Sequence, residues 1–144
     1  MILLKSPREL AHMRTAGQIL AEVKDRLREM VRPGITTKDI DTDVEAFIVG
    51  KGAKSAFKGY RGFPATVCTS INEEIVHGIP SAKRRLAEGD IIGLDLGCIV
   101  EGYYADCAIT LPVGPVAARV QELLDVTRES LDRAIVQCRS GNRL

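Results

Sequence analysis

Two aspartates interrupt the most apolar part of the sequence. Asp95 lies within the run 91–100, and Asp106 lies within the run 103–111. A carboxylate in an otherwise apolar strand is costly unless it is paired, hydrogen-bonded or bound to a cation. These two residues are therefore the first candidates for chemistry, and a metal site is the chemistry that they favour.

The short connection between the two runs decides which face of a sheet each aspartate occupies. If residues 101–102 form a two-residue hairpin loop, facing residues have numbers that sum to 203. Asp106 then faces Gly97, and Asp95 faces Ala108. Both carboxylates would point to one face as diagonal neighbours, about 7–8 Å apart at the backbone. That spacing suits two carboxylates that share one cation or bridge two, because the ions of two-metal hydrolytic sites lie about 3.5–4 Å apart.

This register depends on the length of the turn. A three-residue loop or a bulge would reverse the parity, and the two aspartates would then make separate hydrogen bonds at strand edges. In the two-residue register, Gly93, Gly97 and Ala108 share the face of the carboxylates. These small residues are expected to leave the space around the carboxylates uncrowded.

His77 is the next candidate. It lies in the segment 72–80, which ends in Gly and Pro and is predicted to form a turn and a second short strand. A lone histidine is more often a structural or surface residue than a catalytic one. A neutral imidazole near a polarised carbonyl can nevertheless donate or accept a hydrogen bond. The residue types alone make Tyr60 and Phe63, in the preceding Gly-rich loop, ordinary anchors of that loop.

Two helices must precede the strands that carry these residues. Each begins with a capping box, in which a hydroxyl residue is followed three positions later by an acidic one: Ser6 with Glu9, and Thr36 with Asp39. Apolar residues then recur at helical spacing over positions 10–27 and 40–48. Pro and Gly residues after positions 32 and 49 end the two helices.

The strands and a last helix complete the order of elements. Residues 65–71 are predicted to form a short strand, and the runs 91–100 and 103–111 form a hairpin. A third helix follows Gly114, with an apolar stripe from Val116 to Cys138. Two helices, paired strands and a helix predict an α+β fold, with helices packed on an antiparallel sheet, rather than an alternating βαβ chain.

Composition limits the class of protein. The 144 residues are 45% hydrophobic and 27% charged, which is typical of one globular domain. Twenty Lys and Arg against nineteen Asp and Glu give a net charge of +1, which argues against a nucleic-acid or membrane-surface partner. No apolar run approaches the ~20 residues of a membrane span, and no signal peptide is recognisable. A cytoplasmic location is predicted, with the four cysteines as free thiols.

Several motifs together resemble the type I methionine aminopeptidases. The segment 59–73, GYRGFPATVCTSINE, followed by HGIP at 77–80, is similar to the substrate-pocket segment of that family. The segments GDIIGLD at 89–95 and GYYAD at 102–106 resemble its first two metal-ligand segments. The resemblance implies the N-terminal half of a pita-bread α+β fold, with residues 1–144 as a C-terminally incomplete domain. It also implies the removal of N-terminal methionine from peptides and nascent proteins.

The resemblance gives roles to the candidate residues. Asp95 would bind one divalent metal ion and Asp106 would bridge two, with Co, Mn, Fe and Zn as the possible metals. His77 would be catalytic, as a hydrogen-bond partner of the substrate near the scissile amide. The pocket for the methionine side chain would be lined by Tyr60, Phe63 and Cys68, whose sulfur and aromatic edges suit a thioether. Phe57 stands where many members of the family have a cysteine.

The family completes its metal site with a further His and two Glu from the second half of the fold. After Asp106 the sequence has no His, and its only Glu residues, Glu122 and Glu129, are predicted to be exposed charges on the last helix. The missing second half is therefore the implied partner, and the chain by itself is expected to be inactive.

Three alternatives remain open. The Gly-x-x-Gly at 59–62 occurs in KH domains, which bind a nucleic-acid backbone, although Pro64 and a strand follow here instead of a helix. A pita-bread protein that binds without catalysis would have no need of Asp95 and Asp106. A proline-specific metallopeptidase of the same fold would usually carry an additional N-terminal domain.

Overall fold

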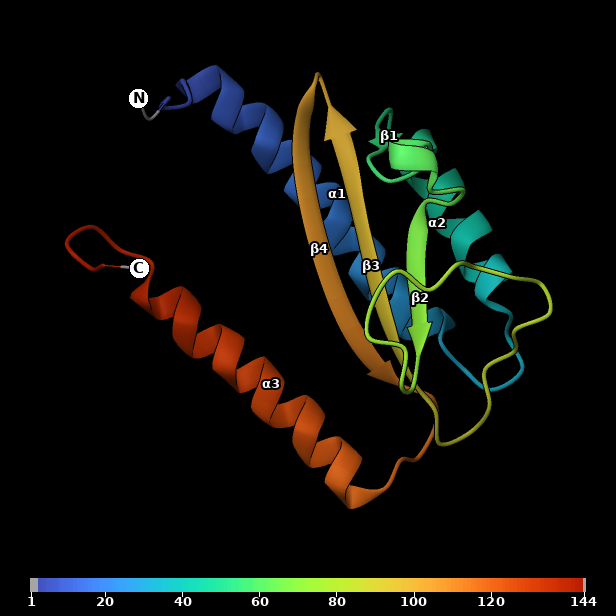
Figure 1. Ribbon diagram of the computed structural model, residues 1–144. Helices are drawn as coiled ribbons and strands as arrows, with labels where there is room; N and C mark the ends of the chain where they lie inside the picture. The colour runs from blue at the N-terminus through green and yellow to red at the C-terminus, as the bar shows by residue number, and fades with distance from the viewer. Residues whose placement is uncertain (1–2, 144) are drawn as a thin grey trace.

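The computed structural model describes residues 3–143. Its elements follow in the order α1 (Pro7–Met30), α2 (Thr37–Gly50), β1 (Lys54–Ser55), the 3-10 helix η1 (Tyr60–Gly62), β2 (Val67–Ile71), β3 (Ile91–Val100), β4 (Tyr103–Pro112) and α3 (Ala118–Gln137). β3 lies at the centre of an antiparallel sheet, with β4 along one side and β1 and β2 along the other (Figure 1). The predicted α+β fold is confirmed.

Both predicted capping boxes are present. The Ser6 amide donates to the Glu9 carboxylate at 2.6 Å, and the Glu9 amide donates back to the Ser6 hydroxyl at 3.4 Å. Thr36 and Asp39 make the same reciprocal pair, at 3.0 and 3.1 Å. Each pair satisfies amides that the first turn of a helix leaves without a partner. These local signals are why the starts of α1 and α2 were predictable.

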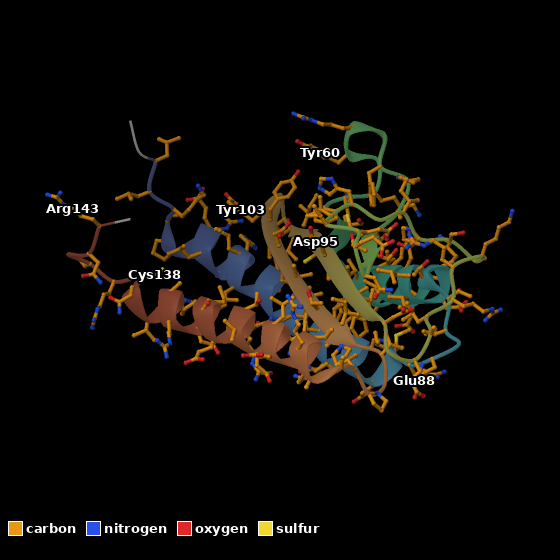
Figure 2. All side chains as sticks on the ribbon, turned by 60° about the horizontal axis from the view of Figure 1, so that its bottom comes forward. Tyr60, Glu88, Asp95, Tyr103, Cys138 and Arg143 are labelled. Carbon is orange, nitrogen blue, oxygen red and sulfur yellow. The ribbon has the colours of Figure 1, made fainter. Side chains whose placement is uncertain are left out.

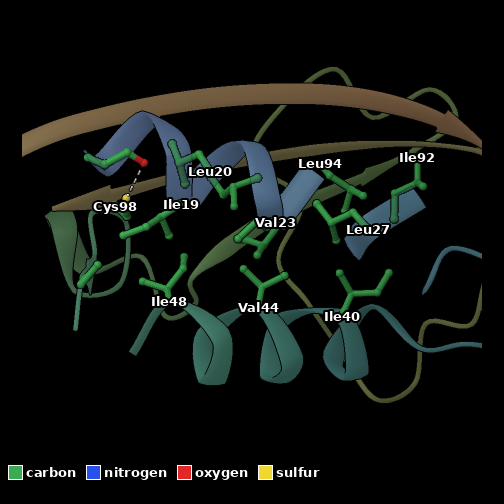
Figure 3. Packing of buried hydrophobic residues seen from close by; sticks show 14 of the residues in the cluster. Ile19, Leu20, Val23, Leu27, Ile40, Val44, Ile48, Ile92, Leu94 and Cys98 are labelled. Carbon is green, nitrogen blue, oxygen red and sulfur yellow. Dashed lines mark hydrogen bonds between the residues drawn. The ribbon is translucent and has the colours of Figure 1, made fainter. Parts of the chain in front are cut away.

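α1 and α2 cover one face of the sheet. Figure 3 shows their aliphatic side chains packed against β3, and the thiol of Cys98 donates to the carbonyl oxygen of Ala16 at 3.4 Å. Each fully buried aliphatic side chain contributes about 1.5–3 kcal/mol. Leu10 and Met13 belong to the predicted stripe but are 45% and 37% exposed, since the first turns of α1 extend past β4 (Figure 1). The buried apolar residues of α1 and α2 are Ala16, Ile19, Leu20, Val23, Leu27, Ile40, Val44 and Ile48.

The two faces of β3 differ in chemistry. Leu94, Leu96 and Cys98 are fully buried toward the helices. Because side chains alternate along a strand, Asp95 and Gly97 belong to the opposite face. We call this opposite face of β2, β3 and β4 the site face. Along β4 the residues that alternate toward it are exposed.

α3 stands apart from the sheet (Figure 1). None of its residues is buried, and its large apolar side chains include Leu123, Leu131 and Ile135, which are 59%, 60% and 58% exposed. Within residues 3–143 the predicted stripe of this helix is therefore uncovered. None of the helices in this part of the chain has the length and apolarity needed to cross a bilayer.

The capping box of α1 predicts an acid-sensitive contribution to stability. The Ser6 amide, the Ser6 hydroxyl and the Tyr103 hydroxyl all bond the Glu9 carboxylate, and they lower its pKa from 4.5 to about 2. Since the folded pKa is the lower one, this stabilisation is present above about pH 4.5 and is lost as the pH falls toward 2. We expect Glu9→Gln to lower the urea midpoint at pH 6 and to have progressively less effect below pH 4.5. An effect of constant size from pH 6 down to pH 2 would contradict this assignment.

Candidate metal and substrate site

The hairpin has the predicted register. Asp106 pairs with Gly97 and Asp95 pairs with Ala108, so both carboxylates lie on the site face as diagonal neighbours. Glu101 and Gly102 form the loop, with φ of 49° and 82°. Positive φ at both positions is the requirement of a type I′ turn, whose twist matches that of the flanking strands. The turn therefore fixes the two carboxylates on one face.

The carboxylates form an uncompensated negative pair. Burial raises the pKa of Asp95, the charge of Asp106 raises it further, and His77 lowers it. None of the ion pairs among residues 3–143 includes either aspartate. A half-buried carboxylate beside a second, exposed one favours a bound cation, which would relieve their repulsion. Carboxylate oxygens are suitable ligands for divalent metal ions.

The loop that carries His77 is held against β2 by the next residue, Gly78. The Thr69 amide of β2 donates to the Gly78 carbonyl at 2.7 Å, and the Gly78 amide donates to the Ser70 hydroxyl at 3.1 Å. A Cβ at Gly78 would overlap the carbonyl of Thr69, so only glycine fits this close approach. His77 itself has φ of 60°, a conformation that costs free energy and is found mainly where function or packing requires it.

The predicted second strand over residues 72–80 is wrong. These residues form a turn and an irregular loop that bonds to β2 at Gly78. The Glu74 carboxylate holds the loop, because it accepts from the Ile71 amide at 2.9 Å and from the Arg84 guanidinium at 2.6 Å. These two donors, Arg84 first, lower the pKa of Glu74. The loop is thus fixed by one backbone hydrogen bond to β2 and by the hydrogen bonds of the Glu74 carboxylate rather than by a strand ladder.

Cys68 lies next to the carboxylates in the neighbouring strand. It pairs with Asp95 across β2 and β3 and is 3% exposed. Burial, then the charges of Asp95 and Asp106, raise the pKa of its thiol to about 11. Cys68 is therefore a neutral thiol at physiological pH, which suits the lining of an apolar pocket better than it suits a metal ligand.

The start of β2 is anchored by a buried carboxylate from α2. Asp41 is 1% exposed, and its Oδ1 accepts from the amides of Thr66 and Val67 at 2.8 and 3.1 Å. Lys38 donates to its other oxygen at 2.7 Å. Hydrogen bonds to a charged acceptor contribute about 1.5–3 kcal/mol. Asp41 therefore fixes the strand that carries Cys68.

The two aromatic candidates differ in their placement. Tyr60 is 63% exposed, with the Arg61 guanidinium 5.4 Å from the centre of its ring. Figure 2 shows it on a loop that projects beyond the strands, whereas Asp95 lies on the sheet. Phe63, at the end of η1, is half-buried. The structure thus places Asp95, Asp106 and Cys68 on neighbouring strands of the site face, with His77 on the loop bonded to β2, and it leaves Tyr60 on the projecting loop.

The expectation of an uncrowded face holds at one glycine and is wrong at another. A Cβ at Gly93 would meet nothing closer than 3.6 Å, whereas a Cβ at Gly97 would lie 3.0 Å from Ala56 and 3.1 Å from Phe57. The approach of Phe57 to Gly97 was not predicted from the residue types, and only the resemblance had placed position 57 in the pocket segment. The available signal was Gly97 itself, because a glycine inside a strand often marks a close approach by another segment.

The described residues supply only part of a metal site. No three His, Cys, Asp or Glu side chains of residues 3–143 come together as possible ligands of one ion. Glu122 and Glu129 are exposed on α3, and Glu129 pairs with Arg133. Asp95 and Asp106 are thus the two carboxylates that these residues can offer.

Comparison with protein families and curated proteins gives one consistent result. Residues 11–144 match the model of metallopeptidase family M24. The whole chain is 46% identical to the methionine aminopeptidase of Clostridium acetobutylicum and to methionine aminopeptidase 1 of Bacillus subtilis. In both comparisons the chain spans 58% of the length of the relative.

Solved structures agree with these matches. The methionine aminopeptidase of Thermotoga maritima superposes with a TM-score of 0.91 and 41% identity, over 94% of this chain and 54% of that one. The prolidase of Pyrococcus furiosus has a TM-score of 0.79 at 24% identity, over 91% of this chain and 37% of that one, and shows likeness of fold alone. The predicted pita-bread fold is confirmed, with this chain corresponding to an N-terminal half.

Proposed function

The chain belongs to metallopeptidase family M24, and on that premise we propose that it supplies half of the active site of a methionine aminopeptidase. The substrates would be the N-terminal methionines of peptides and nascent cytoplasmic proteins. The domain over residues 1–144 would be completed by a second half of the same fold, since the relatives are longer than this chain. The observation that carries the proposal is the pair of carboxylates on one open face of the sheet.

The residues of the site fit a divalent cation. Asp95 and Asp106 would hold it, or hold two, with the remaining ligands provided by the second half. When bound, such ions polarise a scissile carbonyl and lower the pKa of the attacking water. The candidate metals are Co, Mn, Fe and Zn, and the ligands of the second half would select among them.

The other candidates would bind and orient the substrate. His77, on the loop that Gly78 bonds to β2, would hydrogen-bond the substrate near its scissile amide. The neutral thiol of Cys68 would contact the methionine side chain from the sheet. Phe63 and Tyr60 would close the pocket from the loop, and Tyr60 would become less exposed when the pocket is filled.

A chimera tests this proposal and the role of His77 together. Residues 1–144 are joined to the C-terminal part of the Bacillus subtilis relative, and release of methionine from a Met-Ala-Ser peptide is measured with added cobalt or manganese. We expect chelator-sensitive release. We expect His77→Ala to lower turnover by about 100-fold or more, because a group that bonds the reacting amide contributes 10²–10⁴-fold.

Metal titration by calorimetry separates the role of His77 in substrate binding from a role as a ligand. The affinity of His77→Ala for the metal should stay within a few-fold of the parent chimera. A large loss of metal binding would show that His77 is a ligand instead. A folded parent chimera without methionine release would count against the proposed function as a whole.

A further inference from the structure

We infer that Arg84 is a positioning residue for His77, and that it acts through its ion pair with Glu74. The inference rests on the proposed function, in which His77 hydrogen-bonds the substrate. The guanidinium of Arg84 donates to Oε2 of Glu74 at 2.6 Å, and the same oxygen accepts from the Ile71 amide at 2.9 Å. One carboxylate oxygen therefore joins both the end of β2 and the segment that carries Arg84 to the loop of His77.

The residues directly before His77 do not hold it in place. Ile75 and Val76 are 92% and 59% exposed, and His77 is exposed as well. Within residues 3–143, the hydrogen bonds nearest to these three residues along the chain are those of Glu74 and Gly78. His77 has φ of 60°, and such a conformation persists only where the surrounding structure enforces it. Its position therefore depends on the two attachments that flank it.

The attachment at Gly78 acts from one side only. The carbonyl and amide of Gly78 bond to Thr69 and Ser70 of β2, which fixes the chain directly after His77. Each residue keeps two soft backbone dihedrals, so a segment held at one end can still rotate about them. The second attachment, at Glu74, removes this freedom from the side of the loop that precedes His77.

Arg84 is suited to hold that second attachment because its own backbone is fixed on the start of α2. The Thr37 amide donates to the Arg84 carbonyl at 3.0 Å, and the next residue, Arg85, pairs with Thr36 in an isolated β-bridge. The side chains of Arg84 and Glu74 are 31% and 38% exposed, so solvent screens their pair only in part. A guanidinium donates in fixed directions, which makes the attachment directional. Arg84 thus ties the loop of His77 to α2.

Nuclear magnetic resonance on the 144-residue chain tests the placement of His77 without requiring activity. The sequence contains two histidines, so the imidazole Cε1–Hε1 spectrum has one signal from His77 and one from His12. His12 stacks on Tyr103 and serves as the internal reference. We expect Arg84→Ala and Glu74→Ala to move the His77 signal in the same direction, because each variant releases the same attachment. The signal of His12 should stay in place.

Arg85→Ala is the matched control for this measurement. The Arg85 side chain also makes a hydrogen bond, to the Gly34 carbonyl at 2.7 Å, but it takes no part in the pair. Its removal should leave the His77 signal where it is in the parent chain. A His77 signal that does not respond to Arg84→Ala would overturn the inference. Opposite shifts for Arg84→Ala and Glu74→Ala would also overturn it, because they would report the change of charge rather than a release of the loop.

The chimera tests whether the placement matters for turnover. Arg84→Ala should lower kcat by about tenfold or more, because small misplacements of a reacting group have effects of this size. In the His77→Ala background the same substitution should change kcat by less than about twofold, since a residue that acts through His77 has no effect once His77 is gone. Arg84→Lys keeps the charge and should recover part of the lost kcat.

The two possible failures are distinguishable. An equal fall in kcat with and without His77 would show that Arg84 only stabilises the fold, and it would overturn the inference. A folded parent chimera that releases no methionine would contradict the proposed function instead. The resonance measurement on the 144-residue chain would then still decide whether Arg84 places His77.

Discussion

Asp106→Ala is expected to abolish methionine release by the chimera while leaving its fold intact. Asp106 is exposed on β4 and makes no ion pair among residues 3–143. Its replacement by alanine therefore breaks no ion pair of the folded state. It also removes the charge that raises the pKa of Asp95. In the proposed enzyme the same carboxylate holds the cations, and we expect its loss to lower kcat/KM by about 1,000-fold or more.

The measurement combines kinetics, metal titration and thermal unfolding. Asp132→Ala is the matched control, because Asp132 is another exposed aspartate but lies on α3. The Tm of both variants should stay near that of the parent chimera, and only Asp106→Ala should lose activity and metal affinity. Unchanged turnover for Asp106→Ala would rule out its role as a metal ligand.

The register of the carboxylates was predictable because a local feature determines it. Glu101 and Gly102 suit a turn with positive φ at both positions, and such a turn fixes the pairing of every residue along β3 and β4. The capping boxes of α1 and α2 were predictable for the same reason, since each is complete within four residues. Features of this kind can be predicted from a few consecutive residues, because they do not depend on contacts with distant parts of the chain.

The surroundings of the carboxylates were not predictable, because they depend on contacts between distant segments. β-like residue types around His77 suggested a strand, but the close approach of Gly78 to Thr69 and Ser70 produces a loop bonded at one place. The contact of Phe57 with Gly97 joins residues forty positions apart, and the glycine marks where a segment approaches but not which one. The resemblance to a family supplied the roles of His77 and the pocket residues, which remain predictions.

A polypeptide of residues 1–144 by itself is expected to release no methionine from Met-Ala-Ser, even with added cobalt or manganese. Its two carboxylates can attract a hard cation, but no three possible ligands of residues 3–143 come together. A catalytic site needs at least three protein ligands and an open position. We expect metal binding in about the millimolar range, as for weak carboxylate sites, and no activity above the background of the assay.

The same polypeptide should associate, because α3 exposes Leu123, Leu131 and Ile135 without a cover. Sedimentation should show self-association that a separately expressed C-terminal part of the Bacillus subtilis relative suppresses. Mixing the two parts should restore some chelator-sensitive methionine release, and Asp106→Ala in the N-terminal part should prevent the restoration. Robust release by residues 1–144 alone would contradict the ligand count, and it would mean that two copies of the chain assemble a site across their uncovered faces.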